Sequence, residues 1–397
     1  MNHTDVTVLG FTLPEMEMEP ILRWDPAMPA QTHAFAWAVV CALQNAGLTV
    51  GLLSSEPVSN FPQMPRLFYA GHDFKAGNVE GRTLTFVNLL AIKHVTRFIS
   101  CLISGTRLLR SIRPGVLLIH GVHSPFLWYG VIARRLGLRT AVIITDPPGV
   151  FLPADGMVTR LLKAVDARLV RAALARVDGV VVLTRQLALD YAEGRPFLVM
   201  EGIYSEPIDE SAVHAAPNAD LSIVYAGGLS SSSGVDRLVL AVEALANSSV
   251  KLTIYGRGEL AGWIDRRSKL DGRIEPVKYT SRKDVMRACR AADLLVQPRP
   301  VDQLVGAYSF PSKLLEYIGS GTPVLSTRLK GIPADYEPYL YWTEDDTVDG
   351  ICNGILGVLA DPTEHRRQKA LRASDFVRSS RTSAVQGIRL RDFLGSL

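Results

Sequence analysis

A serine, a lysine and a glutamate stand in the sequence where they could bind a charged, hydroxylated ligand. Residues 308–327 read Tyr-Ser-Phe-Pro-Ser-Lys-Leu-Leu-Glu-Tyr-Ile-Gly-Ser-Gly-Thr-Pro-Val-Leu-Ser-Thr. Pro311 predicts a helix start, which places Ser312 and Lys313 in the first helical turn. A lysine there is poorly matched to the helix dipole unless an anion binds, because N–H groups, hydroxyl and ammonium then converge on it. Glu316, one turn later, could accept hydrogen bonds from a ribose diol. The alternative is a solvated Lys/Glu pair on a surface helix.

A glycine-rich segment could bring the backbone close to a phosphate group. Residues 225–234 read Tyr-Ala-Gly-Gly-Leu-Ser-Ser-Ser-Ser-Gly and precede a helix expected at 235–246. Gly227, Gly228 and Gly234 permit close approach of a ligand, and the helix start offers unpaired N–H groups and a partial positive charge. The alternative is a strand-to-helix turn, capped by a serine, that binds nothing.

A histidine and an aspartate are candidates for polar groups that contact a bound ligand. His123 follows an expected strand in the sequence His-Gly-Val-His, and Asp146 follows another in Thr-Asp-Pro-Pro. At the carboxyl ends of strands, both residues could line a ligand cleft. The alternatives are a packed or solvent-exposed histidine and an ordinary Asp-Pro turn.

Short apolar strands and amphipathic helices alternate along the chain, which is typical of parallel sheets covered by helices on both faces. Few polar residues interrupt the strands, as expected when both faces are buried. In the first half we expect strands at 7–11, 49–53, 116–120, 140–145 and 179–184 and a helix at 30–46. In the second half we expect strands at 221–226, 251–255, 293–297 and 323–327 and helices at 235–246, 283–292 and 312–320.

Two doubly wound α/β domains are therefore predicted. The first covers residues 1–205 and the second 206–379, with a connecting loop at 201–218 that lacks an apolar period. A helix at 380–397 is expected to pack back on the first domain. Residues 57–87, rich in Pro, Gly and aromatic residues, are expected to depart from the regular pattern. Ligands of such sheets bind beyond the carboxyl ends of the strands, so we expect a ligand in the cleft between the domains.

The composition indicates an ordinary folded protein. Of 397 residues, 47% are hydrophobic and 21% charged, which excludes disordered, collagen-like and coiled-coil chains. The four cysteines include no close pair, so we expect reduced thiols in a reducing compartment. The longest apolar run, 34–43, is about half of the ~20 residues that a membrane span needs. We expect a cytoplasmic protein and, because no paired acidic motif is visible, no metal site.

Positive charge is concentrated in one segment. Residues 82–185 contain 15 Lys/Arg and 4 Asp/Glu, a net of +11, whereas residues 1–81 contain 3 and 8, a net of −5. Residues 206–397 contain 24 of each and sum to zero. We expect the basic residues of 82–185 to attach the protein to an anionic membrane surface, on its inner face. Nucleic acid is not expected as a partner, because the segment has no interleaved aromatic platform.

Helical periodicity within the basic segment separates a polar from an apolar face. The polar positions are Lys93, Arg97, Ser100, Ser104, Arg107 and Ser111, and the apolar positions opposite them are Leu89, Ile92, Ile99, Leu102 and Ile103. We expect the apolar face to pack on the sheet and the basic face to be exposed. A second helical stretch repeats the basic pattern with Arg160, Lys163, Arg168 and Arg171.

Residues 221–335 resemble the donor domain of retaining GT-B glycosyltransferases of family 4. The order of motifs carries the resemblance: the strand and Gly-Gly turn, Tyr255-Gly-Arg-Gly258, Tyr279 before a helix ending Ala292-Asp293, Phe310-Pro-Ser-Lys-Leu-Leu-Glu-Tyr317 and Gly321-Thr-Pro-Val-Leu-Ser326. The Phe-Pro-Ser-Lys-Leu-Leu-Glu-Tyr motif is similar to that of polysaccharide and cell-envelope transferases. The resemblance implies a GT-B fold with two Rossmann-like domains, the second for a nucleotide sugar and the first for the acceptor.

The resemblance also implies roles for single residues. Glu316 would bind the ribose, and Ser312 and Lys313 the diphosphate. The backbones of Ser309 and Phe310 would meet the sugar. For a transfer of this kind we expect His123 to lie near a donor or acceptor sugar and Asp146 to orient an acceptor hydroxyl. The base would lie near the side chains Tyr255, Val277 and Lys278.

The chain departs from the family pattern at several positions. The first Glu of the family's motif falls at Tyr308, and the Arg and Lys that usually follow the Gly-Gly fall at Leu229 and Ser233. We expect Lys313 or Arg299 to supply the missing positive charge. The early glycine-rich loop of the family falls near residues 29–31 without glycines, and its frequent histidine falls at Asp146.

These observations predict a metal-independent retaining glycosyltransferase without cofactor. It would transfer a hexose from a UDP- or GDP-linked sugar to a glycolipid, lipid-linked or polysaccharide acceptor. Two alternatives stay open: a non-catalytic sugar-nucleotide-binding subunit of another transferase, and a GT-B sugar-nucleotide epimerase. The expected donor site consists of Gly227, Gly228, Ser233, Gly234, Tyr255, Val277, Lys278, Arg299, Tyr308, Ser309, Phe310, Ser312, Lys313 and Glu316.

Overall fold

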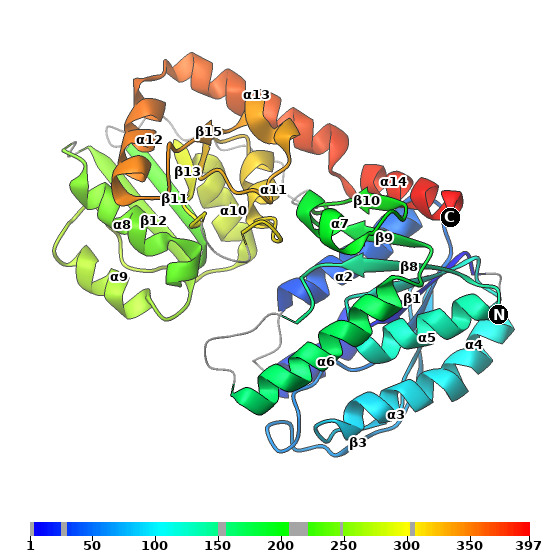
Figure 1. Cartoon of the computed structure of the whole chain (residues 1–397). Helices are drawn as coiled ribbons and strands as arrows, with labels where there is room; N and C mark the ends of the chain where they lie inside the picture. Colours follow the sequence, from blue (N-terminus) through cyan, green and yellow to red (C-terminus); the bar gives the residue numbers. More distant parts are fainter. Residues whose placement is uncertain (1–3, 25–29, 150–155, 206–220, 247–248, 302–305) are drawn as a thin grey trace. The chain divides into compact units, whose positions relative to one another are not determined.

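The computed structural model describes residues 4–24, 30–149, 156–205, 221–246, 249–301 and 306–397 (Figure 1). The chain divides into two compact units, here called unit 1 and unit 2. Unit 1 comprises residues 1–203 and 383–397, and unit 2 comprises residues 204–382. Sequence analysis places the boundaries at 205 and 379. Much of the expected connecting loop, residues 206–220, lies outside the described residues.

Unit 1 is built on an eight-stranded sheet of order β10-β9-β8-β7-β1-β2-β5-β4. All neighbouring strands are parallel except β4, which is antiparallel to β5. The central strands β1, β2 and β7 are buried at every residue, which explains their uninterrupted apolar sequences. The strands are β1 (Val6–Gly10), β2 (Val50–Ser54), β4 (Asp73–Ala76), β5 (Val79–Thr83), β7 (Val116–His120), β8 (Arg139–Ile144), β9 (Gly179–Val182) and β10 (Phe197–Val199).

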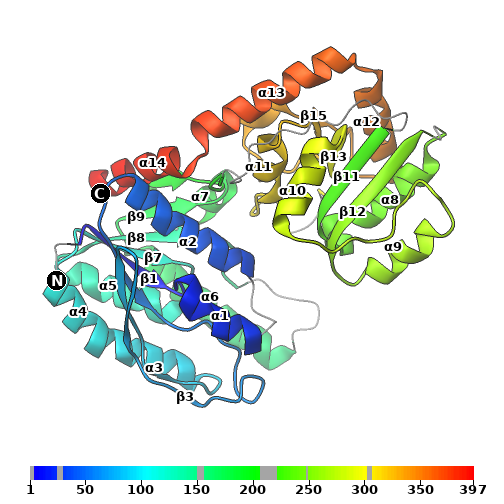
Figure 2. The same cartoon turned by 180° about the vertical axis from the view of Figure 1, so that it is seen from behind.

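Helices cover both faces of this sheet. Figure 1 shows α3, α4, α5 and α6 on one side, and Figure 2 shows α2 on the other. Between α3 and α4 the chain passes through a π-helical turn, Cys101–Gly105. The helices are α1 (Glu15–Trp24), α2 (Ala30–Asn45), α3 (Ile92–Ser100), α4 (Thr106–Ile112), α5 (Ser124–Arg135), α6 (Met157–Leu174), α7 (Arg185–Tyr191) and α14 (Ser383–Ser396).

The last helix, α14, packs against α2 within unit 1. Leu390 and Leu394 of α14 share a buried cluster with Val39 and Leu43 of α2. Gly387 lies inside α14. A Cβ at this position would stand 1.9 Å from the carbonyl oxygen of Ala42, so the glycine permits close packing of the two helices.

Residues 57–87 are more regular than expected. They contain β4 and β5, which extend the main sheet, and a small antiparallel pair, β3 (Phe68–Tyr69) with β6 (Phe86–Val87). These strands have two to five residues, too few to establish a period in the sequence.

The expected orientation of the helix at 92–100 is wrong. Lys93, Arg97 and Ser100 of α3 are buried, whereas Ile92 and Ile99 are about half exposed. The buried polar groups find partners, which offsets the loss of hydration. The helix therefore presents its polar face to the protein and its apolar face to the outside.

Unit 2 is built on a five-stranded parallel sheet of order β12-β11-β13-β14-β15. Its strands are β11 (Leu221–Gly228), β12 (Val250–Arg257), β13 (Leu294–Gln297), β14 (Val324–Ser326) and β15 (Tyr341–Trp342). Its helices are α8 (Val235–Ala244), α9 (Ala261–Ser268), α10 (Arg282–Ala291), α11 (Lys313–Gly319), α12 (Val348–Ala360) and α13 (Thr363–Ser380).

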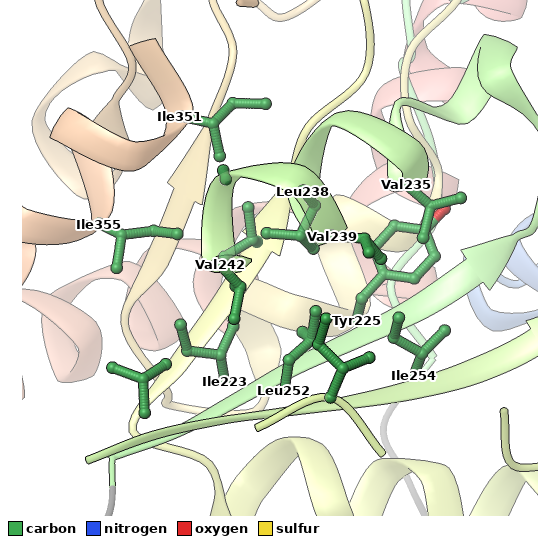
Figure 3. Packing of buried hydrophobic residues seen from close by; sticks show 14 of the residues in the cluster. Ile223, Tyr225, Val235, Leu238, Val239, Val242, Leu252, Ile254, Ile351 and Ile355 are labelled. Carbon is green, nitrogen blue, oxygen red and sulfur yellow. The ribbon is translucent and has the colours of Figure 1, made fainter. Parts of the chain in front are cut away.

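One hydrophobic cluster of unit 2 fills the space between the sheet and α8 and α12. Figure 3 shows Leu238 and Val242 of α8 lying over Ile223 of β11, with Ile351 and Ile355 of α12 beside them. Each of these side chains is fully buried, and burial of such a side chain is worth about 1.5–3 kcal/mol. This packing fixes the start of α8 next to the carboxyl end of β11, where the glycine-rich turn lies.

Candidate functional site in unit 2

The glycine-rich turn joins β11 to α8 through a short 3-10 turn at Ser231–Ser233. Gly234 has φ +74°, and a Cβ there would lie 2.0 Å from the carbonyl oxygen of Pro298, so this glycine is required by the fold. Gly227 is half-buried, whereas Gly228 is exposed. A Cβ on Gly228 would meet only the Ser233 hydroxyl, at 3.3 Å. The turn is therefore open to a ligand at Gly228 and Ser233.

Arg299 lies directly after β13, beside this turn. Its guanidinium donates a hydrogen bond to the Ser309 hydroxyl at 3.2 Å, and its carbonyl accepts one from Thr327 at 2.6 Å. Burial lowers the pKa of Arg299, and the neighbouring Tyr225 partly offsets this effect. Arginine remains protonated in proteins, and no described carboxylate forms an ion pair with Arg299. A half-buried cation in this position is suited to an anionic ligand.

Lys313 and Glu316 lie on the first turn of α11, with Ser312 exposed at the N-cap. Their charged atoms are 4.0 Å apart. A stronger partner of Glu316 is Arg282, the first residue of α10, whose guanidinium donates to the carboxylate at 2.7 Å. Sequence analysis missed Arg282. It stands 34 residues before Glu316, and only the packing of α10 beside α11 brings the two together.

Tyr317 fixes α11 to the end of β11. Its buried hydroxyl accepts a hydrogen bond from the Ala226 N–H at 2.6 Å and donates one to the Ala226 carbonyl at 3.0 Å. Burial raises the pKa of Tyr317 well above its usual value, so the hydroxyl keeps the proton that it donates. Lys313 and Glu316 are thereby held at a fixed position relative to Gly227 and Gly228.

The residues expected near a base lie at the end of β12. Tyr255 pairs with Lys278 in a parallel bridge, and the Lys278 ammonium contacts the Glu275 carboxylate at 2.6 Å. The Val277 N–H donates to Asp265 at 2.9 Å, and the Val277 side chain packs against the core. Tyr255 is half-buried and Lys278 exposed, so these two side chains are the accessible part of the group.

The three residues of the segment 308–310 differ in how far their side chains are accessible to a ligand. Phe310 is buried against Tyr336, with ring centroids 5.6 Å apart, so only its backbone is available to a ligand. Ser309 is half-buried and holds Arg299. Tyr308 is also half-buried. Leu229, which falls where the family resemblance leads us to expect a cation, is fully buried in the core.

The two candidates in unit 1 have different surroundings. His123 precedes α5 and packs among the rings of Phe11, His94 and Phe126 at 5.1, 5.0 and 4.7 Å. Burial lowers its pKa well below the usual value, and its Nε2 has no hydrogen-bond partner among the described residues. Burial therefore favours the neutral form of the His123 imidazole. Asp146 is exposed and accepts a hydrogen bond from Thr145 at 2.8 Å.

Two buried charged residues near His123 were not expected from the sequence. Arg97 lies over the rings of Phe11 and Phe86, and burial raises the pKa of Glu56, whose Oε2 has no partner among the described residues. Arg97 donates to the Glu56 carbonyl at 2.8 Å. No local sequence signal marks this cluster, because the two residues come from separate elements.

Two further findings concern the described residues only. They contain no group of three or more His, Cys, Asp or Glu side chains placed to hold a metal ion. None of the helices among them is both long and apolar enough to cross a membrane.

Comparison with known proteins addresses the fold and unit 2. Residues 220–361 match the family described as Glycosyl transferases group 1. A GDP-mannose-dependent alpha-(1-6)-phosphatidylinositol dimannoside mannosyltransferase of Mycobacterium tuberculosis is 25% identical over 177 residues. That match covers 43% of this chain and 44% of the relative, so it spans less than half of either protein.

Solved structures resemble the whole chain. A structure described as trehalose-6-phosphate from E. coli bound with UDP-2-fluoro glucose has a TM-score of 0.66 at 12% identity and covers 99% of both chains. Sucrose-phosphate synthase from Thermosynechococcus elongatus has a TM-score of 0.64 at 15% identity, again over 99% of both chains. The expected fold is confirmed: the chain has the GT-B fold, and its residues 220–361 match glycosyl transferases of group 1.

Proposed function

We propose that this chain is a retaining glycosyltransferase of the family 4, cell-envelope type. It transfers a hexose from a UDP- or GDP-linked sugar to a glycolipid, lipid-linked or polysaccharide acceptor. The observation that carries the proposal is Arg299, a half-buried cation held against Ser309 without a carboxylate partner among the described residues. The family match over residues 220–361 supports it, because that segment contains Arg299 and α11.

The proposed chemistry requires positive charge at the leaving group. When the glycosidic bond of the donor breaks, negative charge accumulates on the nucleotide diphosphate. Arg299 and Lys313 replace the cations that Leu229 and Ser233 cannot supply. Because both are protein side chains, the transfer would proceed without a metal ion. Activity in the presence of a chelator is the expected result, and restoration of lost activity by Mg²⁺ or Mn²⁺ would contradict this part.

Glu316 would bind the ribose of the donor. Its carboxylate is held by Arg282 at one oxygen, while the other lies 4.0 Å from the Lys313 ammonium. A carboxylate fixed in this way can accept hydrogen bonds from a diol without first being ordered, which reduces the entropy lost on binding. Gly228 and Ser233, across from α11, would contact the phosphates, and Tyr255 and Lys278 would border the base.

The test is the Arg299→Ala variant measured for nucleotide binding and for sugar transfer. Loss of one charged group at a developing anion lowers turnover by roughly 10²–10³-fold. Arg328→Ala is the matched control, because Arg328 is an exposed arginine of unit 2 paired with Glu337. Unchanged binding and turnover in Arg299→Ala would contradict the proposal.

The non-catalytic alternative is favoured by one observation. Leu229 is part of the hydrophobic core, Ser233 carries no charge and Tyr308 occupies the position of a motif glutamate, so three groups expected from the family resemblance are replaced. Nucleotide diphosphates that raise the melting temperature without any slow hydrolysis of the donor would favour that role. An epimerase would instead convert the sugar nucleotide without an acceptor.

The acceptor and its location form a separate part of the proposal. The name of the mycobacterial relative includes a phosphatidylinositol dimannoside, which supports a lipid-linked acceptor here. We propose peripheral attachment to the inner, cytoplasmic face of an anionic membrane by basic residues of 82–185. Lys93 and Arg97 do not contribute to this surface, because both are buried. Exposed arginines of this segment remain, among them Arg107, Arg110, Arg160, Arg168 and Arg171.

A further inference from the structure

Helix α3 exposes an apolar face that nothing in the described part of the chain covers. Ile92, Val95 and Ile99, spaced three and four residues apart, are 47, 58 and 46% exposed. Ile103, in the π-helical turn that follows, is 58% exposed. Soluble proteins expose single apolar side chains routinely, but a continuous row of them along a helix indicates a binding surface.

Buried polar contacts hold α3 in this orientation. The Lys93 ammonium donates to the Val58 carbonyl at 2.6 Å and to Asn60 at 3.0 Å. The Arg97 guanidinium donates to Ser55 at 2.8 Å. A rotation that buried the isoleucines would break these bonds and leave the partners inside without hydrogen bonds. The apolar face is thus fixed outward.

Helix α6 has a second exposed apolar face. Leu161, Leu162, Val165 and Leu169 are 65, 63, 44 and 44% exposed, although α6 buries Val170 and Leu174 near its end. Four-residue spacing places 161, 165 and 169 on one side of the helix. The first two-thirds of α6 therefore carry an exposed row of apolar side chains, whereas the end of the helix packs on the protein.

The two helices are neighbours. Both pack against α5, and Figure 1 shows them on the same side of the sheet. At the start of α5, Ser124 donates to Asp166 of α6, while His123 contacts His94 of α3 with ring centroids 5.0 Å apart. The two apolar faces are parts of one surface, which we call the α3–α6 face.

Charge distinguishes among the possible occupants of this face. Arg107 and Arg110 of α4, which follows α3, and Arg160 and Arg168 of α6 are exposed, and Asp166 is the one acidic residue in α3, α4 and α6. Two copies of the chain joined through this face would bring arginines together. Aromatic anchors that dominate protein interfaces are absent from the exposed apolar residues of these helices. Apolar side chains with a basic margin match anionic lipid headgroups above acyl chains.

We infer that the α3–α6 face inserts its apolar side chains into the headgroup boundary of an anionic phospholipid bilayer. The arginines contact the lipid phosphates. The inference rests on the peripheral attachment proposed above, but it adds an apolar component that salt does not screen. It makes no use of the donor site, so attachment and sugar transfer can fail independently.

Co-sedimentation with vesicles of phosphatidylcholine and phosphatidylglycerol tests the inference. Val95→Ser with Ile99→Ser should weaken binding roughly ten-fold, because each removes apolar area that would enter the bilayer. Arg160→Gln with Arg168→Gln should weaken binding roughly thirty-fold at low salt. In about 0.5 M salt, where charges are strongly screened, residual binding should persist in the unmodified protein and vanish in the serine pair.

Matched control variants test whether any loss of exposed apolar or charged side chains would weaken vesicle binding. Leu356→Ser with Leu371→Ser removes two similarly exposed side chains of unit 2, and Arg367→Gln with Arg372→Gln removes two exposed charges of α13. Both pairs should leave binding unchanged. Val95→Trp should shift its fluorescence to shorter wavelength with vesicles and be quenched by brominated acyl chains.

Several results would overturn the inference. If high salt releases the unmodified protein completely, attachment is electrostatic and the insertion is wrong. If no vesicle is bound under any condition, the attachment proposal fails as well. A dimer in sedimentation velocity that the serine pair dissociates would assign the face to a second copy. Since the side chains concerned are exposed, circular dichroism should show an unchanged fold in every variant.

Discussion

The hydroxyl of Tyr317 and the backbone of Ala226 exchange two hydrogen bonds inside unit 2, one in each direction. This contact joins the helix that carries Lys313 and Glu316 to the strand that ends in the glycine-rich turn. A tyrosine that reads as a core residue in the sequence thus sets the spacing between the two halves of the candidate donor site.

Tyr317→Phe should destabilise unit 2 by about 1–3 kcal/mol, because it leaves a buried N–H and a buried carbonyl without this partner. Urea or thermal unfolding measures the loss. Tyr279→Phe removes a hydroxyl from an exposed ring and should have no comparable effect. Equal stability of the two variants would show that the Ala226 groups find other partners.

Lys313→Ala should abolish sugar transfer and leave the fold intact, since the side chain is 41% exposed and adds little packing. Turnover with a saturating donor is the quantity to measure, with circular dichroism as the check on folding. Lys283→Ala changes another lysine of unit 2 and should retain activity. Unchanged turnover in Lys313→Ala would remove this residue from the site.

Glu316→Ala should weaken binding of a ribonucleotide diphosphate more than that of its 2′-deoxy analogue. The carboxylate is proposed to accept hydrogen bonds from both ribose hydroxyls. The 2′-deoxy analogue has only one of them, so removal of the carboxylate costs it less binding free energy. Arg282→Ala, which frees the carboxylate without removing it, should give an intermediate affinity. Calorimetric titration of both nucleotides against the three proteins provides the comparison, and equal losses for the two nucleotides would contradict the ribose role.

The stability of unit 1 should fall in acid because of His120. Burial lowers its pKa from 6.5 to about 4, and its Nε2 has no hydrogen-bond partner among the described residues. The unfolded chain binds a proton below pH 6.5 and the folded chain does not, so stability is complete above that pH and falls as the pH drops toward 4. The shift corresponds to a loss of about 3 kcal/mol at most.

His120→Asn should reduce this pH dependence between 6.5 and 4, leaving the part that comes from His123, whose pKa burial also lowers, whereas a change at the exposed His365 should not. The free energy of unfolding, measured for each variant between pH 6.5 and 4, tests this prediction. An unchanged slope in His120→Asn would assign the acid sensitivity to other groups.

Sequence analysis predicts best those elements that are buried on all sides. The strand at 116–120 matches β7, because a strand buried on both faces is an unbroken apolar run. The helix at 92–100 was placed with the wrong face inward, because periodicity separates two faces without saying which is buried. The orientation of this helix depends on hydrogen-bond acceptors at 55–60, which are more than 30 residues away in the chain.

The candidate site also contains some contacts that the sequence predicts and others that it does not. Lys313 and Glu316 belong to one helix, so their proximity follows from helical spacing. Arg282 and the Tyr317 contact involve separate elements, and no local pattern predicts them. For Arg299, flanking prolines in the sequence are equally compatible with a plain loop, and only its burial and its contact with Ser309 single it out.

The packing of α14 against α2 affects the order in which the chain folds during synthesis. Unit 2 is one continuous segment, residues 204–382, so all of it has been made while the last helix of unit 1 has not. Unit 1 lacks Leu390 and Leu394 until residues 383–396 leave the ribosome, although its sheet is made first. The unit that begins first is therefore completed last, and until then the surface of α2 that receives α14 stays uncovered.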